Sequence, residues 1–149
     1  MAGSRGGILT GDAGNSGPLV LFSTTADTGV VALDAGNGRA VFTYALAAGA
    51  GPVTLLDDGT ILVRGPLGLV ALSAAGERLW FLNVAANFGA AAVADDGTLY
   101  VAGGPPGSFG AAPAQTDTLY AVQGPARLAN APWPAPRHDS ANTGFAGGP

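Results

Sequence analysis

The chain has no cysteine and no lysine, and only one glutamate and one histidine among its 149 residues. Without cysteine, a disulfide scaffold, a thiolate metal site and a cysteine nucleophile are all excluded. The six arginines are spread along the chain and form no cluster, so a nucleic-acid surface is not expected. With a net charge of −4 and 48% hydrophobic residues, the chain is too apolar for a disordered acidic segment, and its length predicts one domain.

Long apolar runs are also missing. The start of the chain lacks the apolar run of about 7–15 residues that a secretory signal contains. No stretch approaches the roughly 18 apolar residues of a membrane helix, and the most apolar window, Ala85–Ala94, is interrupted by Asn87 and Gly89. The sequence therefore predicts no membrane insertion, and it leaves the compartment of the protein open.

What the chain does contain is an internal repeat. The segment Asp57–Val63 recurs 38 residues later as Asp95–Val101. The segment Val30–Phe42 matches Leu69–Phe81 at an offset of 39. A third copy of this second motif begins 50 residues beyond Leu69, as Leu119-Tyr-Ala-Val, after an insertion rich in Gly, Pro and Ala. Repeats of this length are typical of solenoid and propeller architectures.

The second unit indicates what each repeat forms. Four short apolar runs are separated by turn signals that contain Gly, Asp or Pro. An Asp-Gly pair between apolar runs favours a hairpin, because Gly tolerates the positive φ of hairpin turns. Each repeat is therefore predicted to be a four-stranded antiparallel meander. Continuous apolar runs indicate strands covered on both faces, as in the radially stacked sheets of a propeller; a flat sandwich is the second interpretation.

The predicted fold class is thus all-β, a β-propeller-type repeat with about three four-stranded antiparallel blades. The repeats occupy residues 1–131, with blades at about 7–46, 52–84 and 90–130, and a Pro/Gly-rich tail occupies 132–149. In the first unit the expected strands are Ile8–Thr10, Leu19–Phe22, Val30–Leu33 and Ala40–Ala45. The fourth strand of the third unit is poorly marked.

Two motifs carry a resemblance to a known family. The segment Gly29–Gly38 reads Gly-Val-Val-Ala-Leu-Asp-Ala-Gly-Asn-Gly, and Gly68–Trp80 carries the same signature with a terminal Trp. Both resemble the repeat of pyrroloquinoline-quinone-like β-propellers. The tail Trp133–Gly144 resembles the Trp-Pro-x-x-Arg-His-Asp-x-x-x-Thr-Gly segment at the ends of bacterial members. The resemblance covers nearly the whole chain and implies the propeller fold, in a family that is often exported.

The same resemblance raises the question of a quinone cofactor. Quinoprotein dehydrogenases of this fold hold the cofactor against a Trp, a vicinal Cys pair and a calcium ion. This chain has no Cys and only two tryptophans, Trp80 and Trp133, so that pattern carries over to no position. We therefore expect no bound cofactor, no catalytic residues and no enzymatic activity.

The tail offers the candidate interaction residues. Trp133, Arg137, His138 and Asp139 are predicted to dock the tail on a blade or to contact a partner. His138-Asp139-Ser140 has the side-chain types of a hydrolase triad, but triads are assembled from distant positions. A lone His is also a poor zinc site, so hydrogen bonding within a tail turn is the better interpretation.

Other residues are better explained by structure than by chemistry. Trp80 lies in an apolar strand, where an aromatic ring buries a large area between sheets; a stacking platform for a ligand is the alternative. The acid pairs Asp57-Asp58 and Asp95-Asp96 precede Gly and a strand, which favours hairpin turns over calcium sites. The insertion between Gly103 and Asp117 lies where binding loops are often placed but has few groups that could specify a ligand.

Two functions follow as hypotheses. The first is a non-enzymatic scaffold or protein-interaction module whose partner is another protein, further propeller blades or a second copy. The second is a piece of a larger propeller enzyme, a quinoprotein dehydrogenase or hydrolase, whose active residues lie outside this chain. Closed propellers have about four to eight blades. Three units would leave the apolar faces of the first and last sheets exposed. The chain is therefore expected either to be the C-terminal part of a longer propeller or to complete one by pairing, with two copies giving six blades; alone, it should dimerise or aggregate.

Overall fold

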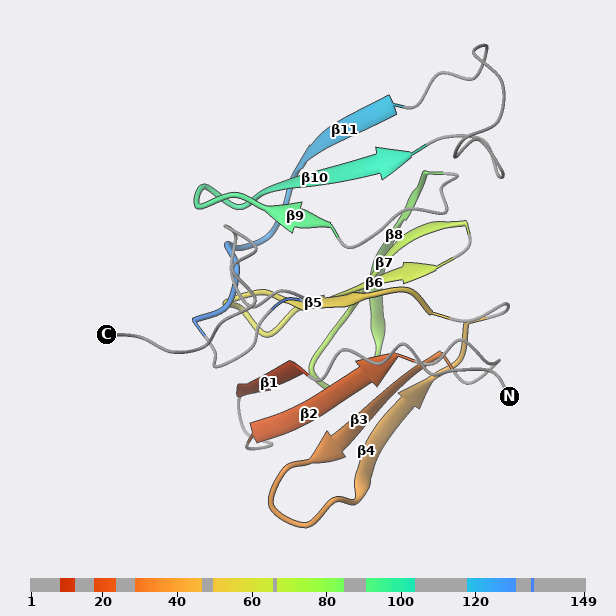
Figure 1. The fold of residues 1–149 in the computed structure, drawn as a ribbon, viewed down its shortest axis with the longest axis vertical. Coiled ribbons are helices and arrows are strands. Elements are labelled where there is room, and N and C mark those ends of the chain that lie inside the picture. The colour runs from red at the N-terminus through yellow and green to blue at the C-terminus, as the bar shows by residue number, and fades with distance from the viewer. Residues whose placement is uncertain are drawn as a thin grey trace.

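The computed structural model describes residues 9–12, 18–23, 29–46, 50–65, 67–84, 91–103, 118–130 and 135. Over these residues the chain forms strands in three antiparallel sheets and no helix (Figure 1). The predicted all-β, antiparallel character is therefore confirmed. In these ranges the structure has no helix that is both long and apolar enough to cross a membrane.

The first sheet is a four-stranded meander in the order β1-β2-β3-β4. Its strands are β1 (Leu9–Asp12), β2 (Pro18–Ser23), β3 (Val30–Asp34) and β4 (Ala40–Tyr44). Asp34 ends β3, because its Oδ1 accepts hydrogen bonds from the Gly36 N–H at 2.7 Å and the Asn37 N–H at 3.1 Å. A short carboxylate that bonds its own backbone in this way favours a turn over a longer strand.

The second sheet repeats this plan in the order β5-β6-β7-β8. Its strands are β5 (Val53–Leu55), β6 (Ile61–Gly65), β7 (Gly68–Leu72) and β8 (Arg78–Asn83). The turn between β5 and β6 is the predicted Asp-Gly hairpin. Asp58 Oδ1 accepts a hydrogen bond from the Thr60 N–H at 2.9 Å, and Gly59 has a φ of 82°.

The third sheet has three strands among the described residues, in the order β11-β10-β9. Its strands are β9 (Ala92–Val93), β10 (Thr98–Gly103) and β11 (Thr118–Gln123). The first hairpin repeats the earlier geometry: Asp96 Oδ1 accepts from the Thr98 N–H at 2.9 Å. In the described segment that follows β11, residues 124–130, the chain adds no fourth strand to this sheet, because its backbone pairs with residues 55–57 at the edge of the second sheet.

After β11 the chain crosses from the third sheet to the edge of the second; we call residues 124–130 the strap. Leu128 forms an antiparallel bridge with Leu56, just beyond β5. The Asp57 N–H donates a hydrogen bond to the Arg127 carbonyl at 2.9 Å, and Arg127 Nε lies 3.2 Å from Asp57 Oδ2. The strap therefore extends the second sheet at its β5 edge instead of adding a strand to the third.

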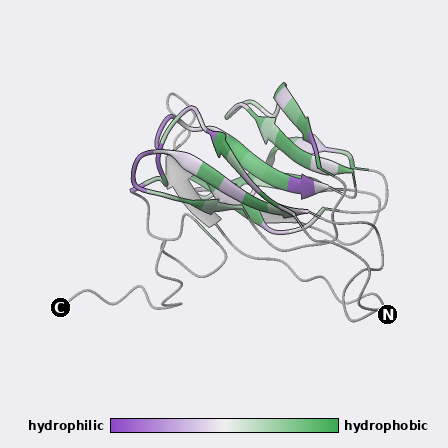
Figure 2. Ribbon diagram, turned by 90° about the horizontal axis from the view of Figure 1, so that it is seen from above, coloured by the Kyte–Doolittle hydropathy of each residue, from purple (hydrophilic) through white to green (hydrophobic). Residues whose placement is uncertain are grey.

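The three sheets stack face to face with the second sheet in the middle (Figure 1). One buried cluster lies between the first and second sheets, and another between the second and third. Every residue of β6 and β7 is buried, so the prediction that continuous apolar strands are covered on both faces is confirmed for the second sheet. Figure 2 shows the hydrophobic residues along the strands and hydrophilic residues in the connecting turns.

Each sheet has two faces, and we name them by chain order. The forward face packs on the next sheet and the backward face on the previous one. Leu62, Leu69 and Ala71 lie on the forward face of the second sheet, in the cluster that includes the third sheet. Val63 and Val70 lie on its backward face, in the cluster that includes the first sheet.

The strand register corrects one detail of the repeat. The ungapped match at an offset of 39 aligns Trp80 with Val41. In the structure Trp80 pairs with Ala71 as Phe42 pairs with Ala32, so Trp80 and Phe42 are equivalent. The last pairs of the two hairpins are Leu33 with Ala40 and Leu72 with Arg78. The chain between Leu33 and Ala40 is one residue longer than the chain between Leu72 and Arg78, which shortens the offset to 38 beyond it.

Candidate functional site

The predicted tail residues Trp133, Arg137, His138 and Asp139 lie outside the residues that the structure describes. Their docking or partner role therefore stays a prediction. The insertion at residues 104–117 also lies outside the described ranges.

The acid pairs Asp57-Asp58 and Asp95-Asp96 lie in hairpin turns, as predicted. Asp58 and Asp96 each accept a hydrogen bond from the backbone two residues on. The bond from the Thr98 N–H lowers the pKa of Asp96, because it favours the charged carboxylate. Within the described ranges, no three His, Cys, Asp or Glu side chains gather as a metal site would require.

Trp80 is half-buried and packs against the cluster between the second and third sheets. Its ring lies on the same forward face as its strand partner Ala71. The interpretation of Trp80 as a packing residue between sheets therefore agrees with its position. Part of the ring remains exposed, so the site is not a fully enclosed core position.

We expect Trp80→Ala to lower the free energy of unfolding by about 1.5–3 kcal/mol, below the roughly 3–5 kcal/mol of a fully buried aromatic. Urea unfolding followed by circular dichroism would measure this. Phe81→Ala is the matched control, since Phe81 is the next residue but is 44% exposed. A loss no larger than that of the control would place the Trp80 ring on the surface.

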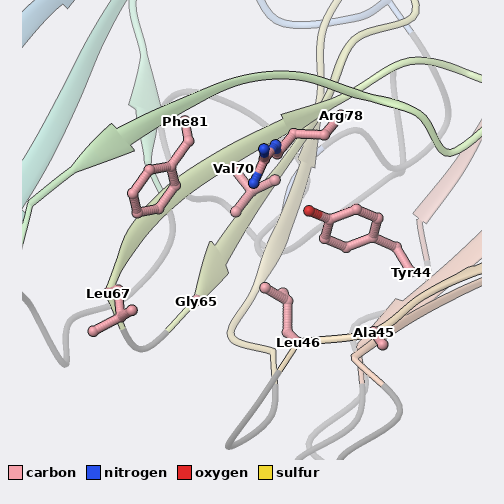
Figure 3. Close-up of a pocket in the computed structure, with 8 residues that line it drawn as sticks. All are labelled: Tyr44, Ala45, Leu46, Gly65, Leu67, Val70, Arg78 and Phe81. Atoms are coloured by element: carbon pink, nitrogen blue, oxygen red, sulfur yellow. The ribbon is translucent and has the colours of Figure 1, made fainter.

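A pocket of about 290 Å³ opens between the first and second sheets, beside β4 and β8 (Figure 3). It is lined by Tyr44, Ala45, Leu46, Gly65, Leu67, Val70, Arg78 and Phe81. The Tyr44 hydroxyl and the Arg78 guanidinium are the polar side-chain groups in this lining. The other lining residues are apolar or glycine.

Arg64 is a buried cation that the sequence did not single out. It lies on β6, pairs with Leu69 in the register and is 3% exposed. Its Nη2 donates a hydrogen bond to the carbonyl of Ala102 on β10 at 3.3 Å, and burial lowers its pKa. In the sequence, Arg64 is marked only by being a single charged residue inside an apolar run. Its hydrogen bond to the Ala102 carbonyl shows that it links the second sheet to the third.

The outer side of the third sheet is an exposed apolar surface. We call it the open face, and its residues are Ala92, Tyr100, Ala102, Leu119 and Ala121. The register places them together, because Tyr100 pairs with both Ala92 and Ala121, and Ala102 pairs with Leu119. All five are exposed, with Tyr100 at 40% and Leu119 at 67%.

The repeat explains why this face is apolar. Its five residues are equivalent to five residues on the forward face of the second sheet. The offset is 38 for the residues on β9 and β10 and 50 for those on β11. The five equivalents are Thr54, Leu62, Arg64, Leu69 and Ala71, all of which are buried. The third sheet therefore presents to solvent the positions that the second sheet uses to bind its neighbour.

Comparisons with known proteins add no further assignment: no protein-family model, no curated protein and no solved structure matches this chain significantly.

Proposed function

We propose that this chain is a β-propeller-type repeat module that acts as a scaffold or protein-interaction surface and has no enzymatic activity of its own. The observation that carries the proposal is the open face. Five exposed, uncharged residues occupy positions that a neighbouring sheet buries in the preceding repeat. Contiguous exposed apolar patches of this kind mark interaction surfaces.

The arrangement of the sheets supports the propeller-type architecture. Successive repeats stack in chain order (Figure 1), and β5 contacts both β1 and β2 of the preceding sheet. The first and second sheets thus approach each other through their first strands, while a pocket opens beside their last strands, β4 and β8. Sheets that converge on one side and diverge on the other are what radial packing around an axis produces.

The chemistry of the open face defines the kind of partner. Alanine, leucine and tyrosine side chains offer apolar area without a charge that would select phosphate or metal ions. Tyr100 and Leu119 stand out from three alanines, so the face suits a complementary apolar sheet that can receive two large side chains. The partner class is therefore a protein surface, such as further blades of the same repeat.

The test is whether the open face drives association. In sedimentation velocity at about 100 μM, the wild type should sediment as a species heavier than its 14.5 kDa chain. The double variant Tyr100→Lys/Leu119→Lys should sediment as a monomer, because burying two unpaired ammonium groups in an interface is strongly unfavourable. The expected shift in dissociation constant is at least about 100-fold.

The matched control is Ala75→Lys/Asn83→Lys, which adds the same two charges at exposed positions of the second sheet. This control should associate like the wild type. A wild type that is monomeric at 100 μM, or a control that loses association as fully as the open-face variant, would contradict the proposal.

A further inference from the structure

The stack within the chain shows which surface a forward face binds. The forward face of the first sheet includes Val30 and Ala32 and packs on the backward face of the second sheet. The forward face of the second sheet packs in turn on the backward face of the third, which includes Leu99 and Val101. Both interfaces join a forward face to a backward face, so contact between repeats is head-to-tail.

In the part of the chain that the structure describes, two faces remain outside this series. One is the open face, which is the forward face of the third sheet. The other is the backward face of the first sheet, where Val31 and Leu33 are half-buried and Val41 and Thr43 are exposed. We call these four residues the entry face.

Two of the four entry-face residues have equivalents that are covered in the second sheet. The equivalents of Val41 and Thr43, Leu79 and Phe81, lie at the exposed margin, at 53% and 44% exposure. Val31 and Leu33 are equivalent to Val70 and Leu72 of the second sheet, at an offset of 39. Those two equivalents are 3% and 0% exposed because the first sheet covers them. Among the described residues, the entry face therefore lacks a covering sheet on the backward side, as the open face does on the forward side.

We infer that the partner of the open face is the entry face of a second copy of this chain. The inference rests on the proposed function and specifies its partner. It extends a contact that the chain already makes twice, and none of the nine residues that define the two faces carries a charge that would have to be desolvated. Because each copy carries both faces, two copies form two identical contacts and close on themselves, giving a ring of six sheets.

The absence of cysteine allows this geometry to be tested by cross-linking. Leu119→Cys places a thiol on the open face, and Thr43→Cys places one on the entry face; both positions are exposed. The two positions also lie at the same height along their strands. Leu119 is equivalent to Val30 of the first sheet, and Thr43 pairs with Val31, the residue next to Val30. Purified single-cysteine variants are mixed, allowed to exchange and treated with a short bis-maleimide.

The expected result in the mixture is a covalent dimer that joins residue 119 of one copy to residue 43 of the other. It should contain about half of the chains, because random exchange pairs unlike variants in about half of the dimers. Each variant alone should give only the background seen with Asn83→Cys, an exposed position off both faces. The double variant Thr43→Cys/Leu119→Cys should stop at the dimer.

The alternative outcomes separate the two proposals. A 119–119 product from Leu119→Cys alone would mean that the open face binds itself, which overturns the inference and leaves the proposed function standing. A ladder of higher products from the double variant would overturn the closed pair. A wild type that stays monomeric in sedimentation, with no product in any mixture, would overturn both.

Discussion

Replacing Gly68 by alanine should lower the free energy of unfolding by about 2–6 kcal/mol, as roughly 1–3 kcal/mol of backbone strain adds to roughly 1–3 kcal/mol of overpacking. Gly68 begins β7 with a φ of 154°. A Cβ here would collide with the Leu82 carbonyl oxygen on β8 and lie 3.0 Å from the Val84 nitrogen. Because these are backbone atoms, relief would require the paired strands to move apart.

The first repeat has the same constraint at Gly29, which precedes β3 with a φ of 73°. There a Cβ would meet the Tyr44 carbonyl oxygen and lie 2.7 Å from the Leu46 nitrogen. The glycine that opens the repeated motif is therefore required by the close approach of the neighbouring strand, and Gly29→Ala should be similarly damaging.

Gly38→Ala provides the control for Gly68→Ala. Gly38 has a φ of 71°, but no atom lies within 4 Å of the position that an alanine methyl group would take there. The variant should therefore lose only the backbone contribution of about 1–2 kcal/mol. Urea unfolding followed by circular dichroism gives both values. Equal losses at Gly38 and Gly68 would show that strand contact is not the cause.

A second large effect is expected at Leu69, where Leu69→Ala should cost about 2–5 kcal/mol. Leu69 is 1% exposed in the cluster between the second and third sheets, and truncation would leave a cavity there. Its repeat equivalent, Leu119, is 67% exposed on the open face. Leu119→Ala should change the stability of the monomer by less than about 0.5 kcal/mol.

The comparison of these two leucines is best made by chemical unfolding at a low micromolar concentration, where association contributes little. At about 100 μM, Leu119→Ala should instead weaken the association that we propose for the open face, because the variant removes the more exposed of its two large side chains. Similar losses of stability for Leu69→Ala and Leu119→Ala in the dilute protein would refute the assignment of the open face.

Local signals in the sequence predicted most of the strands. The Asp-Gly pairs at Asp58 and Asp96 act over two residues, so their hairpins could be predicted without knowledge of the fold. The equivalence of Trp80 and Phe42 was missed, because an ungapped match cannot detect the one extra residue between the paired residues Leu33 and Ala40. The course of the chain after β11 was missed as well, since it depends on pairing with a distant strand edge.

The candidate site shows the same division between local and long-range information. Apolar patterning indicates that Leu69 and Leu119 belong to equivalent strands, but it is identical for a covered face and an open one. Only the stacking order reveals that Leu69 has a neighbouring sheet and that Leu119 faces solvent. Burial of Arg64 is likewise a consequence of the third sheet, whose Ala102 carbonyl accepts its hydrogen bond.

The strap has a consequence for the time at which the second sheet is completed during synthesis. Leu56 and its partner Leu128 are 72 residues apart in the chain. At about 5–20 residues per second, a ribosome needs roughly 4–14 s to make that stretch. Throughout this interval the backbone groups at the β5 edge have no strap to pair with, and an unpaired strand edge readily joins other chains. The β5 edge of the nascent protein is therefore open to misassembly for the seconds before the strap emerges.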